Sequence, residues 1–142
     1  MHSAYFETRF IVSAEPTDWP DEFVIVSAHA TTGERWTTEE NEGAHLELLQ
    51  EVERLGARVG TVVGFSPTTG HAEPSVVAKL PLSTGCDLGM RFRQDAIYHV
   101  LGDQLSVTYC DDRRGLVPVG ACFQVVLDVA LAQEEQNVSH QA

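Results

Sequence analysis

The chain has 142 residues, of which 43% are hydrophobic, and its 9 basic and 21 acidic residues give a formal net charge of −12. This length and apolar content are sufficient for one hydrophobic core without disulfides, so we expect a single domain. The excess of negative charge repels phosphate backbones, which argues against direct nucleic-acid binding.

The N-terminal segment lacks the basic start and the apolar run of a signal peptide, and no stretch approaches the ~20 apolar residues that span a bilayer. We therefore expect a soluble, cytoplasmic protein that makes no membrane contact. The three cysteines, Cys86, Cys110 and Cys122, are odd in number and far apart in the sequence. This pattern indicates reduced thiols rather than a disulfide framework or a zinc site.

The first predicted elements are two strands. Residues 4–12 alternate in the manner of a strand, although both faces carry aromatic or branched side chains. After a turn-rich connector, Phe23–Val26 form a continuous apolar run, which is typical of a strand covered on both faces. We take this second segment as the central strand of a sheet.

A helix is predicted over about residues 38–55. Thr37 and Glu40 have the spacing of a capping box, whose side chains satisfy the free amides of a helix start, and Gly56 is well placed to end the helix. The inward stripe of this helix is expected to consist of four apolar residues at helical spacing, Leu48, Leu49, Val52 and Leu55.

Two more strands are predicted at residues 59–65 and 75–80, joined by a loop that contains prolines and glycines. A short helix should follow, capped by Ser83 or Thr84 and running to about Arg93. Two glycines within this helix, Gly85 and Gly89, would allow a close approach of its backbone to the sheet.

A hairpin is predicted at Gly102-Asp103, with strands over residues 96–101 and 104–109. The implied pairing sets His99 opposite Ser106, on the face that we expect to be the wetter one, so His99 should face solvent. The apolar run 119–131 fits either a strand or a helix by its periodicity, and its alanines favour a helix. Residues 133–142 are polar and terminal, which predicts a disordered tail.

Together these elements predict one α+β domain over residues 1–132. We expect two layers, with a largely antiparallel or mixed sheet of five or six strands packed by two or three helices.

A first candidate site lies at the start of the long helix. When its inward stripe is extended backward, Asn41 and His45 fall on the inward face, close to His29 at the exit of the central strand. Ligands gather where strand ends meet helix N-termini, because free amides and the helix dipole favour anionic groups there. The alternative is that Asn41 hydrogen-bonds a neighbouring loop and His45 is a satisfied histidine at the core edge.

A second candidate lies in the loop before the strand at 75–80. His71 and Glu73 are two residues apart and share one side of an extended segment, so they could act in acid/base chemistry or supply two metal ligands. Ser75 completes the same motif. Two ligands do not make a metal site, and completion would need His29, His45 or His99 to converge from elsewhere, although the hairpin register places His99 toward solvent. The alternative is that Glu73 anchors the loop and His71 is a surface residue.

Gln94 is the last candidate residue. It follows the second helix and precedes the hairpin, where an amide with two donors and one acceptor often ties a helix end to a loop.

Several of these segments together resemble a bacterial family known only as a domain of unknown function. The resemblance spans about residues 20–112 and implies a domain boundary, but no activity, cofactor or partner. At two positions the chain departs from the pattern expected of the family: Arg93 stands where we expect glycine, and His29 begins a loop where we expect Asn-Pro. The matching segments are Phe23–Ala28, Glu40-Asn41, Gly64–Pro67, His71–Ser75 and Phe92–Ile97.

Three functional hypotheses follow. The favoured one is a non-catalytic module that binds a small molecule or a protein surface through Asn41, His45, Glu73 and Gln94, because no complete catalytic motif can be assembled. The second is a small hydrolase or transferase that uses His71 and Glu73 as acid/base or metal ligands. The third is an acidic inhibitor or nucleic-acid mimic that acts on a basic partner. No cofactor and no resident metal are predicted.

Overall fold

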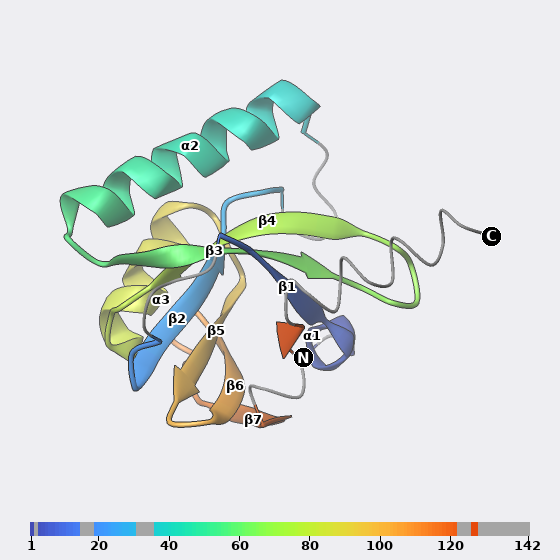
Figure 1. Ribbon diagram of the computed structural model, residues 1–142, viewed down its shortest axis with the longest axis vertical. Helices are drawn as coiled ribbons and strands as arrows, with labels where there is room; N and C mark the ends of the chain where they lie inside the picture. The colour runs from blue at the N-terminus through green and yellow to red at the C-terminus, as the bar shows by residue number, and fades with distance from the viewer. Residues whose placement is uncertain (2, 15–18, 31–35, 122–125, 128–142) are drawn as a thin grey trace.

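A computed structural model describes residues 1, 3–14, 19–30, 36–121 and 126–127. Figure 1 shows one curled sheet with the order β7-β6-β5-β2-β4-β3-β1-β8. Seven strands are antiparallel to their neighbours, and the two-residue β8 runs parallel to β1. The strands are β1 Arg9–Ala14, β2 Glu22–Ser27, β3 Arg58–Phe65, β4 Ala72–Ala78, β5 Ala96–Leu101, β6 Gln104–Tyr109, β7 Val117–Ala121 and β8 Val126–Leu127; the helices are α1 Ala4–Glu7, α2 Thr38–Arg54 and α3 Leu82–Arg91.

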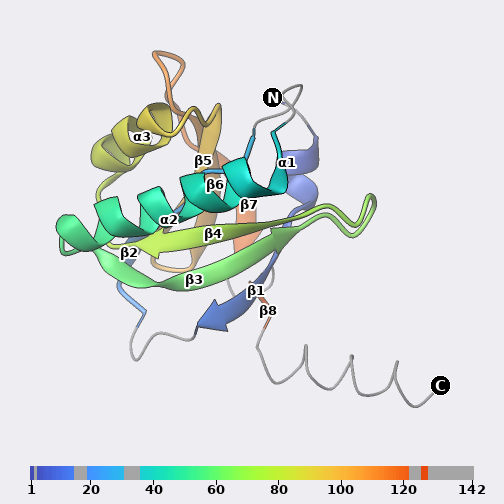
Figure 2. The same ribbon diagram turned by 90° about the horizontal axis from the view of Figure 1, so that it is seen from above.

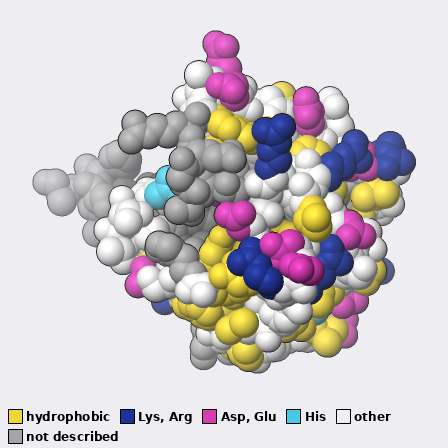
Figure 3. All heavy atoms as spheres, turned by 180° about the vertical axis from the view of Figure 1, so that it is seen from behind, with side chains coloured by type: hydrophobic (Ala, Val, Ile, Leu, Met, Phe, Trp, Pro, Cys, Tyr) yellow, Lys and Arg dark blue, Asp and Glu magenta, His cyan; other side chains and the backbone are white. Residues whose placement is uncertain are grey.

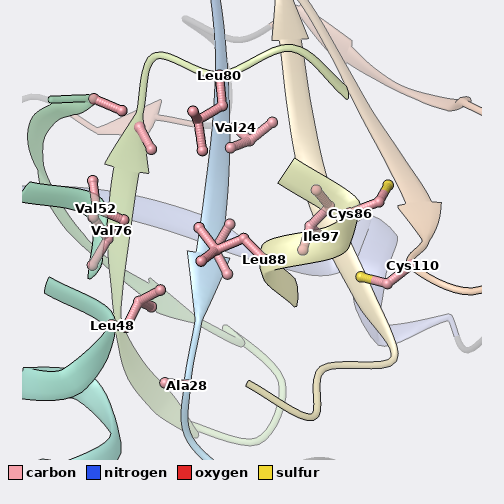
Figure 4. Close-up of a cluster of buried hydrophobic side chains, with 13 residues drawn as sticks. Val24, Ala28, Leu48, Val52, Val76, Leu80, Cys86, Leu88, Ile97 and Cys110 are labelled. Carbon is pink, nitrogen blue, oxygen red and sulfur yellow. The ribbon is translucent and has the colours of Figure 1, made fainter. Parts of the chain in front are cut away.

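The predicted α+β class is confirmed, and so is the central place of the apolar run. Strand β2 lies between β5 and β4 in the middle of the sheet. Its side chains alternate between two cores: Val24 and Val26 belong to the core under α2 and α3, whereas Phe23 and Ile25 belong to the core on the opposite face. Figure 4 shows the first of these cores, with Leu48 and Val52 of α2 reaching the sheet beside the α3 residues.

The sheet curls around the second core. Phe10 of β1 packs edge-on against Tyr98 of β5 with 5.0 Å between ring centroids, although three strands lie between β1 and β5 in the sheet order. This contact is possible only if the opposite parts of the sheet bend toward each other, so one face becomes concave. Helices α2 and α3 cover the convex face (Figure 2).

Helix α2 begins as predicted. Thr37 and Glu40 form the reciprocal capping box, and Gly56 follows the helix with φ +67°, a conformation that favours glycine. Leu48 and Val52 are buried and Leu49 is partly buried. Leu55, expected to complete the stripe, is 41% exposed because it is the C-cap residue, beyond the last turn that faces the sheet.

Helix α3 lies unusually close to the sheet. A Cβ placed on Gly85 would be 2.7 Å from Cγ1 of Val24, and one on Gly89 would be 2.6 Å from Sγ of Cys110. The two glycines therefore permit the predicted close approach. The helix begins at Leu82 with Pro81 as its N-cap residue, so Ser83 and Thr84 lie inside its first turn and neither of them caps it.

The two ends of the described chain differ from the predictions. Residues 4–7 form the single-turn helix α1 rather than a strand, held by Thr8 Oγ1 donating to the carbonyl of Ala4 and by Tyr98 OH donating to the carbonyl of Tyr5. The helix expected over 119–131 is wrong at residues 119–121, which belong to β7, and at Val126–Leu127, which form β8; these strands pair with β6 and β1. The rest of that run lies outside the described residues. These two strands raise the strand number from the expected five or six to eight. The predicted tail over 133–142 lies outside the described residues.

The hairpin register is confirmed, but the expected exposure of one face is wrong. His99 pairs with Ser106 as predicted, yet both are buried. On the same face, Ile97 packs in the core under α3. The side chain of His99 is only 4% exposed, and its Nε2 lies 2.8 Å from Oε2 of Glu22. A strand pairing pattern cannot reveal that a helix will cover one of its faces.

The close packing of α3 predicts opposite effects for the same substitution in two helices. Gly85→Ala should lower the free energy of unfolding by about 1–3 kcal/mol, because the new methyl group overlaps the stiff, buried Val24. Gly43→Ala in α2, where the added Cβ meets nothing within 4 Å, should raise it by about 0.5–1 kcal/mol through helix propensity. Urea unfolding of both variants measures the difference, and equal shifts would contradict the packing argument.

Candidate functional site

The concave face changes from apolar to polar at one end of the sheet. Along β2, Phe23 and Ile25 are followed by Ser27 on the same face, and along β4, Val77 is preceded by Ser75 and Glu73. The register places Ser27 directly opposite Ser75. The apolar core therefore gives way to a polar region at the same level on two neighbouring strands.

A cavity of about 480 Å³ opens at this end, where β2 and β3 finish and where β1, β4 and β5 start. We call it the concave cavity. Helix α1 contributes Tyr5 and Glu7 to its wall. The remaining polar lining comes from the strand ends and their adjoining loops, namely Ser3, Thr8, Ser27, Ser66, Thr69, His71, Glu73, Ser75, Gln94, Asp95 and Tyr98.

Glu73 is the hydrogen-bonding centre of the concave cavity. Ser27 Oγ donates to its Oε2 at 3.0 Å, and His71 Nε2 lies 3.0 Å from its Oε1. The Glu73 side chain is 26% exposed, whereas that of His71 is 69% exposed. The loop geometry thus brings together the predicted pair, and β2 adds a hydroxyl that the sequence analysis did not select.

The order of these three groups limits their chemistry. In a nucleophile–histidine–acid triad the imidazole stands between the hydroxyl and the carboxylate, so that it can take the proton of the nucleophile. Here the carboxylate of Glu73 stands in the middle, and Ser27 donates to it directly. The arrangement fixes a carboxylate in place and does not create an activated hydroxyl.

Ser75 is a largely buried residue whose hydroxyl is accessible from the cavity and has no protein hydrogen-bond partner among the described residues. It is only 5% exposed and it lines the concave cavity. Its position between two paired strands holds its backbone firmly, since β4 pairs there with both β2 and β3. The hydroxyl can therefore act as a donor or an acceptor toward a group in the cavity.

Two tyrosines in the cavity wall have raised pKa values, chiefly because they are partly buried. Burial raises the pKa of Tyr98 to about 12, with nearby Tyr5 and Glu73 acting in the same direction against a hydrogen bond from Thr8. Burial and then the Asp95 carboxylate raise the pKa of Tyr5. The two rings meet edge-to-face with centroids 6.5 Å apart.

Gln94 holds the backbone that lies between this cavity and the convex face, which α2 and α3 cover. Its Nε2 donates to the carbonyl of His29 at 2.8 Å and to that of Phe92 at 3.2 Å, so it ties the end of α3 to the exit of β2. The preceding residue, Arg93, has φ +60°. Glycine adopts this conformation without steric cost, which explains why glycine is the expected residue at that position.

A second cavity of about 520 Å³ lies on the helix side, lined by His29, Asn41 and His45 together with Thr38, Glu42, Leu46 and Pro74. We call it the helix-side cavity. Asn41 Oδ1 accepts from the backbone N–H of Ala30 at 2.9 Å, which is the loop contact weighed as an alternative above. His29 Nε2 and His45 Nδ1 are buried and have no hydrogen-bond partner within the described part of the chain.

The seven candidate residues are therefore divided between two cavities. His71, Glu73, Ser75 and Gln94 line the concave cavity, and the other three line the helix-side cavity. The cavities share a wall where the backbone N–H of His29 donates to Ser27 Oγ at 3.2 Å. His29 and His45 do not join His71 and Glu73 in one cavity. Within the described ranges, no group of three or more His, Cys, Asp or Glu side chains is arranged to hold a metal ion.

The sequence analysis missed several lining residues of the concave cavity. Ser27 could have been found, because the alternation of β2 places it on the same face as Phe23 and Ile25. Tyr5 and Glu7 left no such signal, since their contribution depends on a helix in place of the predicted strand.

Comparison with known proteins places the chain in a family. The family model described as a protein of unknown function (DUF3293) matches residues 26–97, about half of the chain. The chain belongs to the DUF3293 family. No curated protein and no solved structure matches it.

The matched segment runs from the end of β2 to the start of β5 and includes all seven candidate residues of this DUF3293 member. It is shorter than the 20–112 span of the expected resemblance. None of the helices among the described residues has the length and hydrophobicity needed to cross a membrane.

The helix-side histidines predict how stability depends on pH. Burial lowers the pKa of both His29 and His45 below their ordinary value of 6.5, and for His29 it outweighs the opposing effect of Glu73 and Glu42. The unfolded chain therefore binds more protons below about pH 6.5, so the free energy of unfolding should fall as the pH drops from there toward the folded-state pKa values.

Urea unfolding at pH 7.5, 6.5 and 5.5 measures this effect. The double variant His29→Gln, His45→Gln should lose less stability than the wild type over this interval. Parallel curves for the two proteins would show that these histidines do not titrate differently on folding.

The two hydrogen bonds of the Gln94 amide predict that an isosteric substitution at this position destabilises the protein. Gln94→Glu replaces the donor amide with an oxygen that faces two carbonyl oxygens, so it should lower the free energy of unfolding by about 1–3 kcal/mol. Gln50→Glu, the same change at an exposed position of α2, should alter it by no more than about 0.5 kcal/mol. Chemical denaturation measures the free energy of unfolding of both variants. Similar losses of stability would show that the Gln94 amide does not hold this backbone in place.

Proposed function

We propose that this DUF3293 member is a non-catalytic module that binds a small molecule in the concave cavity around Glu73. The observation that carries the proposal is a carboxylate held in place by Ser27 and His71, together with the accessible hydroxyl of Ser75 in the same cavity. Ligand sites have this composition: a mostly apolar wall and a few polar groups that converge on one point. The cavity also has the volume of such sites.

The geometry favours binding over catalysis. An acid/base enzyme that uses His71 and Glu73 would need a further reactive group within hydrogen-bond reach of the imidazole. His71 contacts Glu73 and is otherwise largely exposed, and the nearest hydroxyl of the network, Ser27, donates to Glu73 rather than to His71. Glu73 is therefore better suited to receive a ligand than to activate a nucleophile.

The third hypothesis, an acidic inhibitor of a basic partner, needs the acids to gather on one face. On the face shown in Figure 3, acidic side chains are interspersed with basic ones. Several charges among the described residues are paired, for example Arg91 with Glu51 and Arg114 with Asp87. Such a surface offers no continuous negative patch for a basic partner on that side.

A thermal-shift screen against a library of soluble metabolites tests the proposed function. A compound present at ~100 times its dissociation constant should add roughly 2.7 kcal/mol of stability, which is several degrees for a domain of this size. The shift should disappear in Glu73→Gln, because this substitution removes the charge and one acceptor of the central side chain.

Glu47→Gln is the matched control, since Glu47 is an exposed residue of α2 outside both cavities. It removes the same charge and should leave the shift unchanged. A compound that stabilises the wild type and both variants equally binds elsewhere, and a library without any stabilising compound would count against a small-molecule function.

A further inference from the structure

We infer that the concave cavity is a site for a small organic cation, an amine with an apolar body, whose ammonium group binds between Glu73 and Ser75. This inference rests on the proposed function and names the ligand class of the same site. Four features of the cavity support it: the sign of its charges, the hydrogen-bonding capacity left at its centre, its unpartnered hydroxyl and its aromatic wall.

The charged groups of the cavity have one sign. Its lining includes the carboxylates of Glu7, Glu73 and Asp95, and none of the described lining residues is a lysine or an arginine. An anionic ligand would face these three carboxylates, and His71, the one basic side chain of the described lining, already contacts Glu73. A ligand ammonium group would meet opposite charge, and the partial burial of Glu73 keeps that attraction from being fully screened by water.

Some hydrogen-bond acceptors at the centre of the cavity have no donor among the described residues of the protein. Each carboxylate oxygen has two lone-pair sites, and one hydrogen bond is recorded at each oxygen of Glu73, from Ser27 and His71 respectively. The hydroxyl oxygen of Ser75 is a further acceptor on the same face of β4, two residues away. An ammonium group has three donors and no acceptor, which fits this set.

Ser75 is a second polar group that a ligand can reach. The residue is only 5% exposed, and its hydroxyl has no protein partner among the described residues and is accessible from the cavity. A rigidly held hydroxyl in such a position can accept a hydrogen bond from a ligand donor beside Glu73.

The apolar part of the wall fits the body of such a ligand. Tyr5, Phe10 and Tyr98 form a contiguous aromatic cluster next to the carboxylates. Aromatic rings attract organic cations and also bury their hydrocarbon parts. The hydroxyl of Tyr98 is already committed to the carbonyl of Tyr5, so this residue offers its ring rather than a free donor.

Matched compounds that differ only in charge test the inference. Benzylammonium, benzyl alcohol and benzoate share one body, and n-pentylammonium, pentanol and pentanoate share another. Titrations followed by ¹H–¹⁵N NMR in phosphate buffer, which contains no competing amine, would give dissociation constants. At least one ammonium compound should bind more tightly than its neutral and anionic partners and should shift the amides of Ser27, Glu73 and Ser75.

Three variants locate the binding. Glu73→Gln should weaken binding of the ammonium compound by about 10- to 100-fold, because a charge-assisted hydrogen bond is lost. Ser75→Ala, which retains the charge, should weaken it by about 3- to 10-fold. Glu47→Gln should bind as the wild type does, although it has the same net charge as Glu73→Gln.

The outcomes separate this inference from the proposed function. If an alcohol or a carboxylate binds as tightly as its ammonium counterpart, or if Glu73→Gln and Glu47→Gln bind the ammonium equally well, the cation site is wrong. If neither ammonium compound binds while a neutral or anionic library compound loses its thermal shift in Glu73→Gln, the cation class is wrong and the binding function stands. If nothing binds in either experiment, both fail.

Discussion

The burial of β2 on both of its faces is the constraint on which the rest of the structure depends. Val24 and Val26 are completely buried under the helices, and Phe23 and Ile25 are buried in the concave core. A strand that is apolar on both sides leaves the least hydrocarbon surface exposed to water when it lies in the middle of a sheet and other parts of the protein cover both of its faces. The helices on the convex side and the curl on the concave side both meet this requirement.

The same strand also sets the place of the concave cavity. Its apolar run stops at Val26, and the next residue on the concave face is Ser27, opposite Ser75. Beyond this level the interior of the curled sheet is too polar to close as a core. Partial burial of Glu73 carries a desolvation cost, which the hydrogen bonds from Ser27 and His71 offset. A polar group set into an otherwise apolar interior is the kind of local conflict that marks a functional site.

A short piece of backbone after β2 forms the shared wall of the two cavities, and two amide side chains hold it. Gln94 binds the carbonyl of His29 from the α3 side, and Asn41 binds the N–H of Ala30 from the start of α2. These contacts connect the exit of β2 with the start of α2 and with the end of α3, and Gln94 is 65 residues away from His29 in the sequence. The family match from residue 26 to residue 97 includes both amides and the wall that they fix.

Local sequence signals determined a large part of this fold. The capping box at Thr37, the stop at Gly56 and the register of the hairpin around Gly102 all depend on residues close together in the chain, so the sequence alone was sufficient to predict them. The pairing of His71 with Glu73 is equally local, because an extended segment places side chains two residues apart on one side.

Only the tertiary structure decided the features that depend on distant partners. Tyr5 is helical because Tyr98 of β5 binds its carbonyl, and Val117–Ala121 form a strand because β6 offers an edge. His99 is buried because α3 covers its face of the sheet, and Ser75 faces a cavity because the sheet curls. Periodicity along the chain records which side chains share a face, but it contains no information about what will cover that face. For that physical reason the sequence predicted the candidate residues, and the fold divided them between two cavities.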